Sequence, residues 1–152
     1  MNRISDALDL LTSQHDQIDA LLANLASDGD EDVRRGLVYE LAELLTGHLA
    51  IEQQVFYPAV AHQLSIDVLG ELLTEHAEIK RVLADLVWCD TVDERFDASI
   101  TELRHLLAGH AAWQDDQLFA PMSAAMTQSD LERLGAHVSF WFDGSATQRV
   151  AA

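Results

Sequence analysis

Cysteine, proline, glycine and basic residues are all scarce in this chain of 152 residues. The single cysteine, Cys89, excludes an internal disulfide bond and any zinc site or c-type haem attachment built on paired cysteines. Two prolines and seven glycines are few helix breakers, and almost half of the residues are hydrophobic. The composition therefore favours an all-α protein that is long enough to bury a core of its own.

Long apolar runs and positive charge are missing as well. No stretch approaches the roughly 20 apolar residues of a transmembrane helix, and the first residues lack the apolar core of a signal peptide. Lys and Arg number 9 against 26 Asp and Glu, which gives a formal net charge of −17. Such a chain repels phosphate backbones and anionic lipids. We expect a cytoplasmic protein, monomer or homodimer, with neither nucleic acid nor a membrane as partner.

Apolar residues recur at intervals of three and four over most of the chain, which is the pattern of amphipathic helices. This pattern predicts four long helices and a short fifth, at about residues 4–26, 32–62, 66–89, 92–125 and 129–142. Ser65, the pair Thr91 and Glu94, and the pair Ser129 and Glu132 are expected to cap the last three helices.

Short connections between these helices predict one domain, an antiparallel, up-down four-helix bundle. The bundle and its short C-terminal fifth helix would occupy residues 1–143, and residues 144–152 would form a flexible tail.

Each half of the chain supplies two helices that follow one design. His15 and His76 both begin a His-x-x-Ile pattern, and His48 and His110 each precede a Phe-x-Pro ending. The segment from His to Phe is one residue longer in the second half. The chain therefore looks like an internal repeat in which the second copy has gained a residue.

The extra residue affects which acidic side chain shares a face with the histidine. Glu52 follows His48 by four residues, whereas Gln114 stands at that distance from His110 and Asp115 comes next. Counted back from Phe-x-Pro, Asp115 corresponds to Glu52. His110 and Asp115 can converge only if the helix is locally widened, as in a π-bulge, or if the site lies between them. Gln114 is the alternative, as a neutral ligand or a hydrogen-bond donor.

Four histidines and two carboxylates on apolar helix faces are costly to bury unless they hold a cation. The candidate ligands are His15, His48, Glu52, His76, His110 and Asp115, with Gln114 as the alternative to Asp115. This set is too large for a structural zinc site and too rich in nitrogen for calcium or magnesium. It suits two first-row ions, each with two histidines and bridged by carboxylates, with iron as first choice and manganese second.

The pattern His15…His48-x-x-x-Glu52…His76…His110, with Phe-x-Pro after the second histidine, resembles the hemerythrin-like, or HHE, domain over about residues 10–125. The resemblance implies a four-helix bundle with an oxo- or hydroxo-bridged, non-haem di-iron centre. Members bind O2, sense oxygen or redox state, hold iron, or act on peroxide and nitric oxide. Many bacterial members resemble His-x-x-x-Glu at the second site, whereas hemerythrins proper resemble His-x-x-x-x-Asp there, which supports Asp115.

One departure from the family concerns the third helix. Hemerythrins proper carry His-x-x-x-His, but here His76 is followed at that spacing by Lys80. The missing histidine leaves either an open metal position or room for a further oxygen ligand, which favours reactivity over simple O2 carriage. Lys80 either points to solvent or hydrogen-bonds a ligand at the metals. Phe56 and Phe119 are expected to wall the metal site, and Trp113 either joins them or is an ordinary core aromatic.

The sequence thus predicts a non-haem di-iron protein that binds and reacts with O2, peroxide or nitric oxide at a carboxylate- and oxo-bridged iron pair. The alternative is a binding protein without turnover that senses O2 or redox state or holds iron. Whether the chain is an enzyme stays open at this point. A third hypothesis is a bundle whose metal is only structural.

Overall fold

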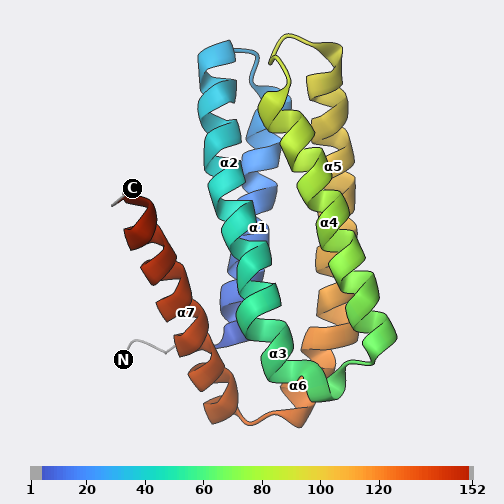
Figure 1. Cartoon of the computed structure of the whole chain (residues 1–152), viewed down its shortest axis with the longest axis vertical. Helices are drawn as coiled ribbons and strands as arrows, with labels where there is room; N and C mark the ends of the chain where they lie inside the picture. Colours follow the sequence, from blue (N-terminus) through green and yellow to red (C-terminus); the bar gives the residue numbers. More distant parts are fainter. Residues whose placement is uncertain (1–4, 151–152) are drawn as a thin grey trace.

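The protein is described by a computed structural model that defines the backbone of residues 5–150 and the side chains of residues 5–144. Figure 1 shows four long helices running alternately up and down, with a fifth against one side. This confirms the all-α, antiparallel four-helix bundle with a C-terminal fifth helix. In chain order the elements are α1 (Ala7–Ser27), α2 (Glu31–Ile51), η1 (Glu52–Phe56), α3 (Tyr57–Val60), η2 (Ala61–Gln63), α4 (Ile66–Trp88), α5 (Glu94–Trp113), η3 (Gln114–Phe119), α6 (Ala120–Ala125) and α7 (Gln128–Val150).

The helix starts show which capping residues the sequence indicates correctly. Ser65 caps α4 as predicted, because its hydroxyl accepts a 3.2 Å hydrogen bond from the first turn of that helix. The predicted cap of α5 is wrong, since Asp93 rather than Thr91 accepts a 2.9 Å hydrogen bond from Arg95 N–H. Thr91 is turned into the bundle, where its carbonyl oxygen accepts a 3.1 Å hydrogen bond from Arg34.

Helix α7 begins earlier and runs longer than predicted. The Thr127 hydroxyl accepts a 3.1 Å hydrogen bond from Asp130 N–H and donates one of 2.8 Å to its carboxylate. This pair, and not Ser129 with Glu132, therefore starts the helix. No described glycine adopts the left-handed conformation that ends many helices, so the backbone continues as helix through residue 150. Residues 151–152 of the expected tail lie outside the described residues.

The long second helix of each half passes through a π-helical segment, η1 or η3. In each segment an N–H reaches the carbonyl five residues back, from Tyr57 to Glu52 and from Ala120 to Asp115. A proline follows directly in both halves. Its ring would clash with the carbonyl four residues earlier in a regular helix, and a widened turn relieves that clash. The sequence indicated such a widening only in the second half.

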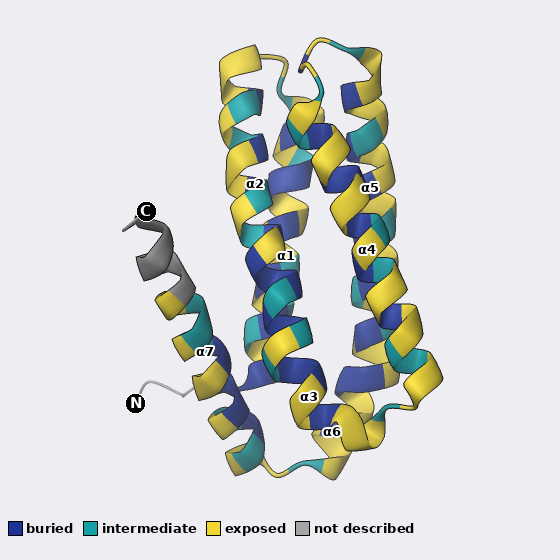
Figure 2. Cartoon of the chain, in the orientation of Figure 1, coloured by how far each residue is buried: buried dark blue, intermediate teal, exposed yellow. Residues whose placement is uncertain are grey.

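The buried residues face the interior of the bundle, as Figure 2 shows, and their apolar members form two cores stacked along it. The upper core includes Ile18, Leu41 and Ile79 and fills the space between the four long helices. The lower core is built on Leu11 and Phe56, together with residues of η3, α6 and α7. Each fully buried side chain of this size contributes about 1.5–3 kcal/mol. The four histidines of the repeat lie between the two cores.

Helix α7 packs closely on the lower half of the bundle. At Gly135 an added Cβ would lie 2.5 Å from the backbone oxygen of Ser5, so only glycine lets the two segments approach this far. The Phe142 ring covers Gly47 of α2, where an added Cβ would lie 3.3 Å from a ring carbon and the ring would have to move slightly. None of the helices in the described residues combines the length and the apolar character that crossing a membrane requires.

Candidate metal centre

Glu52 lies at the centre of four histidines, one from each long helix. Its Oε1 is 2.9 Å from His48 Nε2 and 3.8 Å from His15 Nε2. Its Oε2 is 2.9 Å from His76 Nε2. His110 Nε2 stands between the two oxygens, 3.4 Å from Oε1 and 3.2 Å from Oε2. One carboxylate therefore faces histidines from both halves of the repeat with different oxygens.

The cluster is closed to solvent at all but one residue. Glu52, His48 and His76 are fully buried and His110 is 1 % exposed, whereas the side chain of His15 is 10 % exposed. Enclosed polar groups of this kind need partners inside the protein or a bound ion. His15 is thus the member of the cluster that reaches the molecular surface.

Two further side chains orient the histidines through their Nδ1 atoms. His48 Nδ1 lies 2.7 Å from Gln14 Oε1, and His110 Nδ1 forms a short hydrogen bond with Glu75 Oε1. When Nδ1 donates, the free Nε2 turns toward Glu52 as a potential ligand atom. No pattern in the sequence had singled out Gln14 for such a role. The repeat could have indicated both partners, because each directly precedes the first histidine of its half.

The charges of the cluster are set by its burial. Burial lowers the pKa of His48, and Glu52 opposes that shift only in part. Burial by itself raises the pKa of Glu52. The charge of His48 and hydrogen bonds from the histidines lower it by more, so the pKa of Glu52 lies well below its usual range. For His110, burial lowers the pKa, yet hydrogen bonds to Glu52 and Glu75 raise it to about 9. Glu52 is therefore an anion shared among imidazoles.

Tyr57 and Gln114 complete the polar interior on the side of the lower core. The Gln114 amide donates hydrogen bonds of 2.8 Å to Glu52 Oε1 and 3.0 Å to the Tyr57 hydroxyl. Tyr57 in turn donates a 3.0 Å hydrogen bond to Glu52 Oε2 and lies 3.2 Å from His76 Nε2. Burial and the charge of Glu52 raise the pKa of Tyr57, which keeps the phenol protonated.

Asp115 is not brought to the cluster: its side chain is exposed, and the fully buried Gln114 stands in that place. Helix α5 keeps regular α-helical geometry up to Trp113, so the residue four after His110 shares its face. The expected π-helical turn is present, but it begins only at Gln114. The extra residue of the second half thus falls between Gln114 and Phe119, after the ligand position rather than before it.

The other residues singled out by the sequence fall into two groups. Phe119 stacks on His15, with ring centroids 6.3 Å apart, and Phe56 meets Phe119 edge-on at 5.7 Å. Phe119 therefore lies against the cluster with Phe56 behind it, whereas the half-buried Trp113 packs on the lower core. Lys80 is exposed and donates a 3.2 Å hydrogen bond to Gln53 instead of facing the histidines.

The donor set fits a cation. The buried atoms of the cluster that have no hydrogen-bond partner include His15 Nε2, His48 Nε2 and Gln114 Oε1. His48 Nε2 lies 2.9 Å from Glu52 Oε1, but the two groups are not aligned for a hydrogen bond. Single ligand atoms of His15, His48, Glu52 and His110 all lie within 4.8 Å of one another. Nitrogen and oxygen lone pairs converging in this way are what a first-row metal ion requires.

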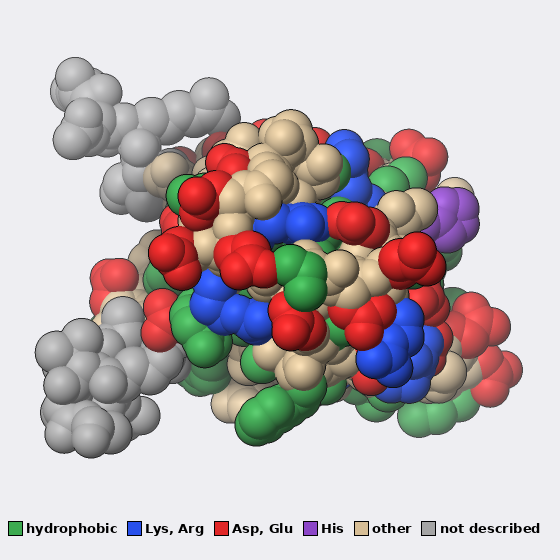
Figure 3. Space-filling view, turned by 90° about the horizontal axis from the view of Figure 1, so that it is seen from above, with side chains coloured by type: hydrophobic (Ala, Val, Ile, Leu, Met, Phe, Trp, Pro, Cys, Tyr) green, Lys and Arg blue, Asp and Glu red, His purple; other side chains and the backbone are tan. Residues whose placement is uncertain are grey.

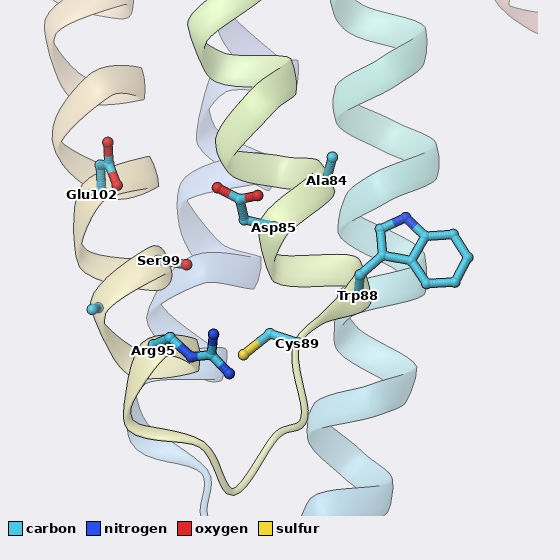
Figure 4. A pocket seen from close by; sticks show the side chains of 8 residues that line it. Ala84, Asp85, Trp88, Cys89, Arg95, Ser99 and Glu102 are labelled. Carbon is cyan, nitrogen blue, oxygen red and sulfur yellow. The ribbon is translucent and has the colours of Figure 1, made fainter.

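A hollow on the surface lies between the upper ends of α4 and α5, away from the histidines. It measures about 570 Å³ and is lined by Trp88, Cys89, Arg95 and Glu102, among others. Figure 4 shows Cys89 and Arg95 pointing toward each other and Trp88 pointing outward. Trp88 follows His76 by 12 residues of helix, about 18 Å. This hollow is therefore separate from the histidine cluster.

The sequence model of the hemerythrin HHE cation binding domain matches residues 6–136. The chain belongs to the hemerythrin HHE family. A solved structure of a hemerythrin HHE cation binding domain-containing protein from Mycobacterium kansasii superposes with a TM-score of 0.82 at 22% identity, covering 97% of this chain and 93% of that one. At this identity the likeness shows a shared fold. HHE domains bind metal cations, and the cluster around Glu52 is where this chain could hold one.

A second similar protein is a DNA nickase from Nostoc sp. PCC 7120, 22% identical over 125 residues. The match takes in 82% of this chain but only 36% of the nickase. This HHE domain thus spans about a third of that relative, and the relative's name describes a much longer protein.

Proposed function

We propose that this HHE domain holds a carboxylate-bridged pair of non-haem iron ions and uses it to bind and react with O2, peroxide or nitric oxide. The supporting observation is the placement of Glu52. One oxygen faces His15 and His48 of the first half, and the other faces His76 of the second half. A carboxylate between two pairs of histidines is suited to bridge two ions, and manganese is the second choice of metal.

In this proposal each half of the chain holds one ion. His15 and His48 would bind the first, His76 and His110 the second, and Glu52 both. Gln114 Oε1 has no hydrogen-bond partner and is a neutral oxygen ligand at hand. Since an amide replaces the second carboxylate, the protein supplies one negative charge fewer to the ions. The less neutralised pair then attracts anionic or electron-rich ligands more strongly.

The surrounding residues limit what can react. A pair of iron ions supplies or accepts electrons for small molecules such as O2, peroxide and nitric oxide. Phe56 and Phe119 close the cluster toward the lower core and exclude bulk water. The Tyr57 hydroxyl, whose oxygen lies 3.0 Å from Glu52 Oε2, donates its proton in a hydrogen bond that keeps the carboxylate oriented. Such an enclosed centre suits molecules of two to four atoms.

The test is metal content combined with optical spectra. Protein freed of metal and reloaded with Fe²⁺ without oxygen is expected to take up about two irons per chain and to show near-ultraviolet charge-transfer bands after oxidation. The Glu52→Gln variant serves as the control and should lose both properties. One iron or none in the wild-type chain would contradict the proposal.

Ligand additions then separate enzyme from binding protein. Disappearance of peroxide or nitric oxide over many turnovers would show an enzyme. A spectral change with O2 that reverses on degassing would instead show a carrier or sensor. An iron-loaded chain whose spectrum responds to none of these molecules would mean that the metal is structural, and the reactivity part of the proposal would fall.

We propose no nucleic-acid role from the nickase relative. The net charge is −17, and on the end of the bundle seen in Figure 3 the Lys and Arg side chains are interspersed with acidic ones. That face shows no continuous basic stripe of the kind that follows a phosphate backbone.

A further inference from the structure

We propose that divalent cations reach the centre through the cavity between α1 and α5, where Asp16 and Asp19 attract them and His15 passes them inward. The proposal rests on the proposed function only in that the cluster around Glu52 is the destination of the ion. It assigns a role to Asp16, Asp19 and the cavity beside them, none of which is needed for the fold or for the cluster around Glu52.

The cavity lies directly outside His15. It measures about 280 Å³, and its lining includes His15, Asp16, Asp19, Leu22, Ala108 and Ala111. On the α5 side the small side chains of Ala108 and Ala111 leave room between the helices. An aquated divalent ion needs space of this order, whereas each larger apolar side chain in their place would fill part of it.

His15 connects the cavity to the buried cluster. Its side chain is nine-tenths buried, its Nε2 has no hydrogen-bond partner, and that atom lies 3.8 Å from Glu52 Oε1. The other three histidines of the cluster are at most 1 % exposed. An ion in the cavity therefore meets His15 first, and a turn of this one ring can deliver it to Glu52.

The mouth of the cavity selects for positive charge. Asp16 and Asp19 are exposed, and neither forms an ion pair among the described side chains. No Lys or Arg lines the cavity. Two unpaired carboxylates raise the local concentration of cations and repel anions. A route built only for neutral gases would gain nothing from them.

A second acidic hollow, outside α4, is the natural rival. Its lining includes Asp67, Glu71, Glu75 and Glu78. Its way inward is occupied, because Glu75 is hydrogen-bonded to His110 Nδ1, on the side of the ring away from Glu52. Glu78 is paired with Arg81 at 2.7 Å. This hollow has the charge but no open path, so it supplies a matched control.

The experiment follows Co²⁺ uptake by metal-free protein in a stopped-flow spectrometer, using the visible absorbance of the bound ion. The double variant D16N/D19N removes two acids from the α1–α5 cavity, and D67N/E71Q removes two from the rival hollow. We expect D16N/D19N to load about tenfold more slowly at low salt, with the difference shrinking at high salt. Its final Co²⁺ content and that of the control should equal the wild type, and the control should load at the wild-type rate.

A steric variant provides an independent arm. Ala111→Leu fills the cavity without changing charge and should also slow loading while leaving the final Co²⁺ content unchanged. Equal slowing by both charge variants would mean that only the overall charge matters, and would overturn the proposal. So would wild-type rates in D16N/D19N and Ala111→Leu. A wild-type chain that takes up no Co²⁺ would instead refute the metal centre itself, which distinguishes failure of the function from failure of the route.

Discussion

Gln114 donates a 2.8 Å hydrogen bond to Glu52 across the histidine cluster, from the position that corresponds to Glu52 in the second half of the folded chain. Both residues stand four positions after a histidine, and both are fully buried. An amide can donate to the carboxylate, whereas a second carboxylate would repel it in the absence of metal. We therefore expect the amide to stabilise the metal-free protein, and in the proposed centre it would offer less negative charge to the ions.

The first prediction compares Gln114→Glu with Asp115→Asn. Gln114→Glu puts two buried carboxylates side by side, so metal-free protein should lose several kcal/mol of unfolding free energy. Once metal is bound, the new anionic ligand should raise affinity for the second ion by about tenfold or more. Denaturant titrations and metal titrations measure the two effects.

Asp115→Asn is the matched control for that prediction. Because Asp115 is exposed, the unfolding free energy of this variant should change by less than about 0.5 kcal/mol, and the protein should bind as much metal as the wild type. Loss of an ion in Asp115→Asn, with no effect of Gln114→Glu, would show that Asp115 is the ligand after all.

Tyr57→Phe tests the hydroxyl that links Glu52, Gln114 and His76. The variant keeps the ring but removes the donor to Glu52 and the acceptor of Gln114, so about 1–3 kcal/mol of stability should be lost. Metal affinity should fall by about tenfold, since the carboxylate of Glu52 is no longer oriented. Tyr39→Phe, at an exposed position, is the control and should be silent in both titrations. Wild-type affinity in Tyr57→Phe would contradict this role.

The pH dependence of metal-free stability follows from two opposite shifts. The pKa of His110 rises from 6.5 to about 9, so its contribution is complete below about pH 6.5 and is lost as pH rises toward 9. The pKa of Glu52 falls below its usual 4.5, so its contribution is present above pH 4.5 and is lost as pH falls. The lowered pKa of His48 also costs stability as pH falls below 6.5, so urea unfolding after chelation should show maximal stability near pH 6.5.

Glu75→Gln is the control for the pH profile. It removes one of the two hydrogen-bonded carboxylates that raise the pKa of His110, so the decline above pH 6.5 should end at lower pH and be smaller in total. A metal-free protein that gains stability between pH 6.5 and 9 would contradict the assigned charges.

Gly135→Ala probes the docking of α7. The new Cβ would lie 2.5 Å from Ser5 O and 2.9 Å from the carbonyl carbon of Asp6, so the helix or the chain start must shift, at a cost of about 1–3 kcal/mol. Gly36→Ala has nothing within 4 Å and sits inside α2, so it should stabilise by about 0.5–1 kcal/mol. Thermal unfolding of both variants measures the contrast. Equal effects would mean that α7 does not pack as described.

Local patterns in the sequence predicted the helices well and their ends less well. The spacing of apolar residues located the four long helices and the fifth, whose length it underestimated, and Ser65 was a sufficient signal for the start of α4. Thr91 was a misleading signal, because a capping pattern does not reveal that the residue is turned inward to meet Arg34. Which of two adjacent acceptors caps a helix depends on packing that a local pattern does not contain.

The sequence by itself determined the bundle, a histidine on the apolar face of each of the four bundle helices, and Glu52 on the face of His48, because these follow from helical periodicity within single segments. Only the tertiary structure decided between Gln114 and Asp115. That choice depends on where the π-helical turn begins, and therefore on the fit of Phe119 against Phe56 and His15 from other helices. The same holds for Gln14 with His48 and Glu75 with His110, since side chains so far apart in the chain meet only once the helices have packed.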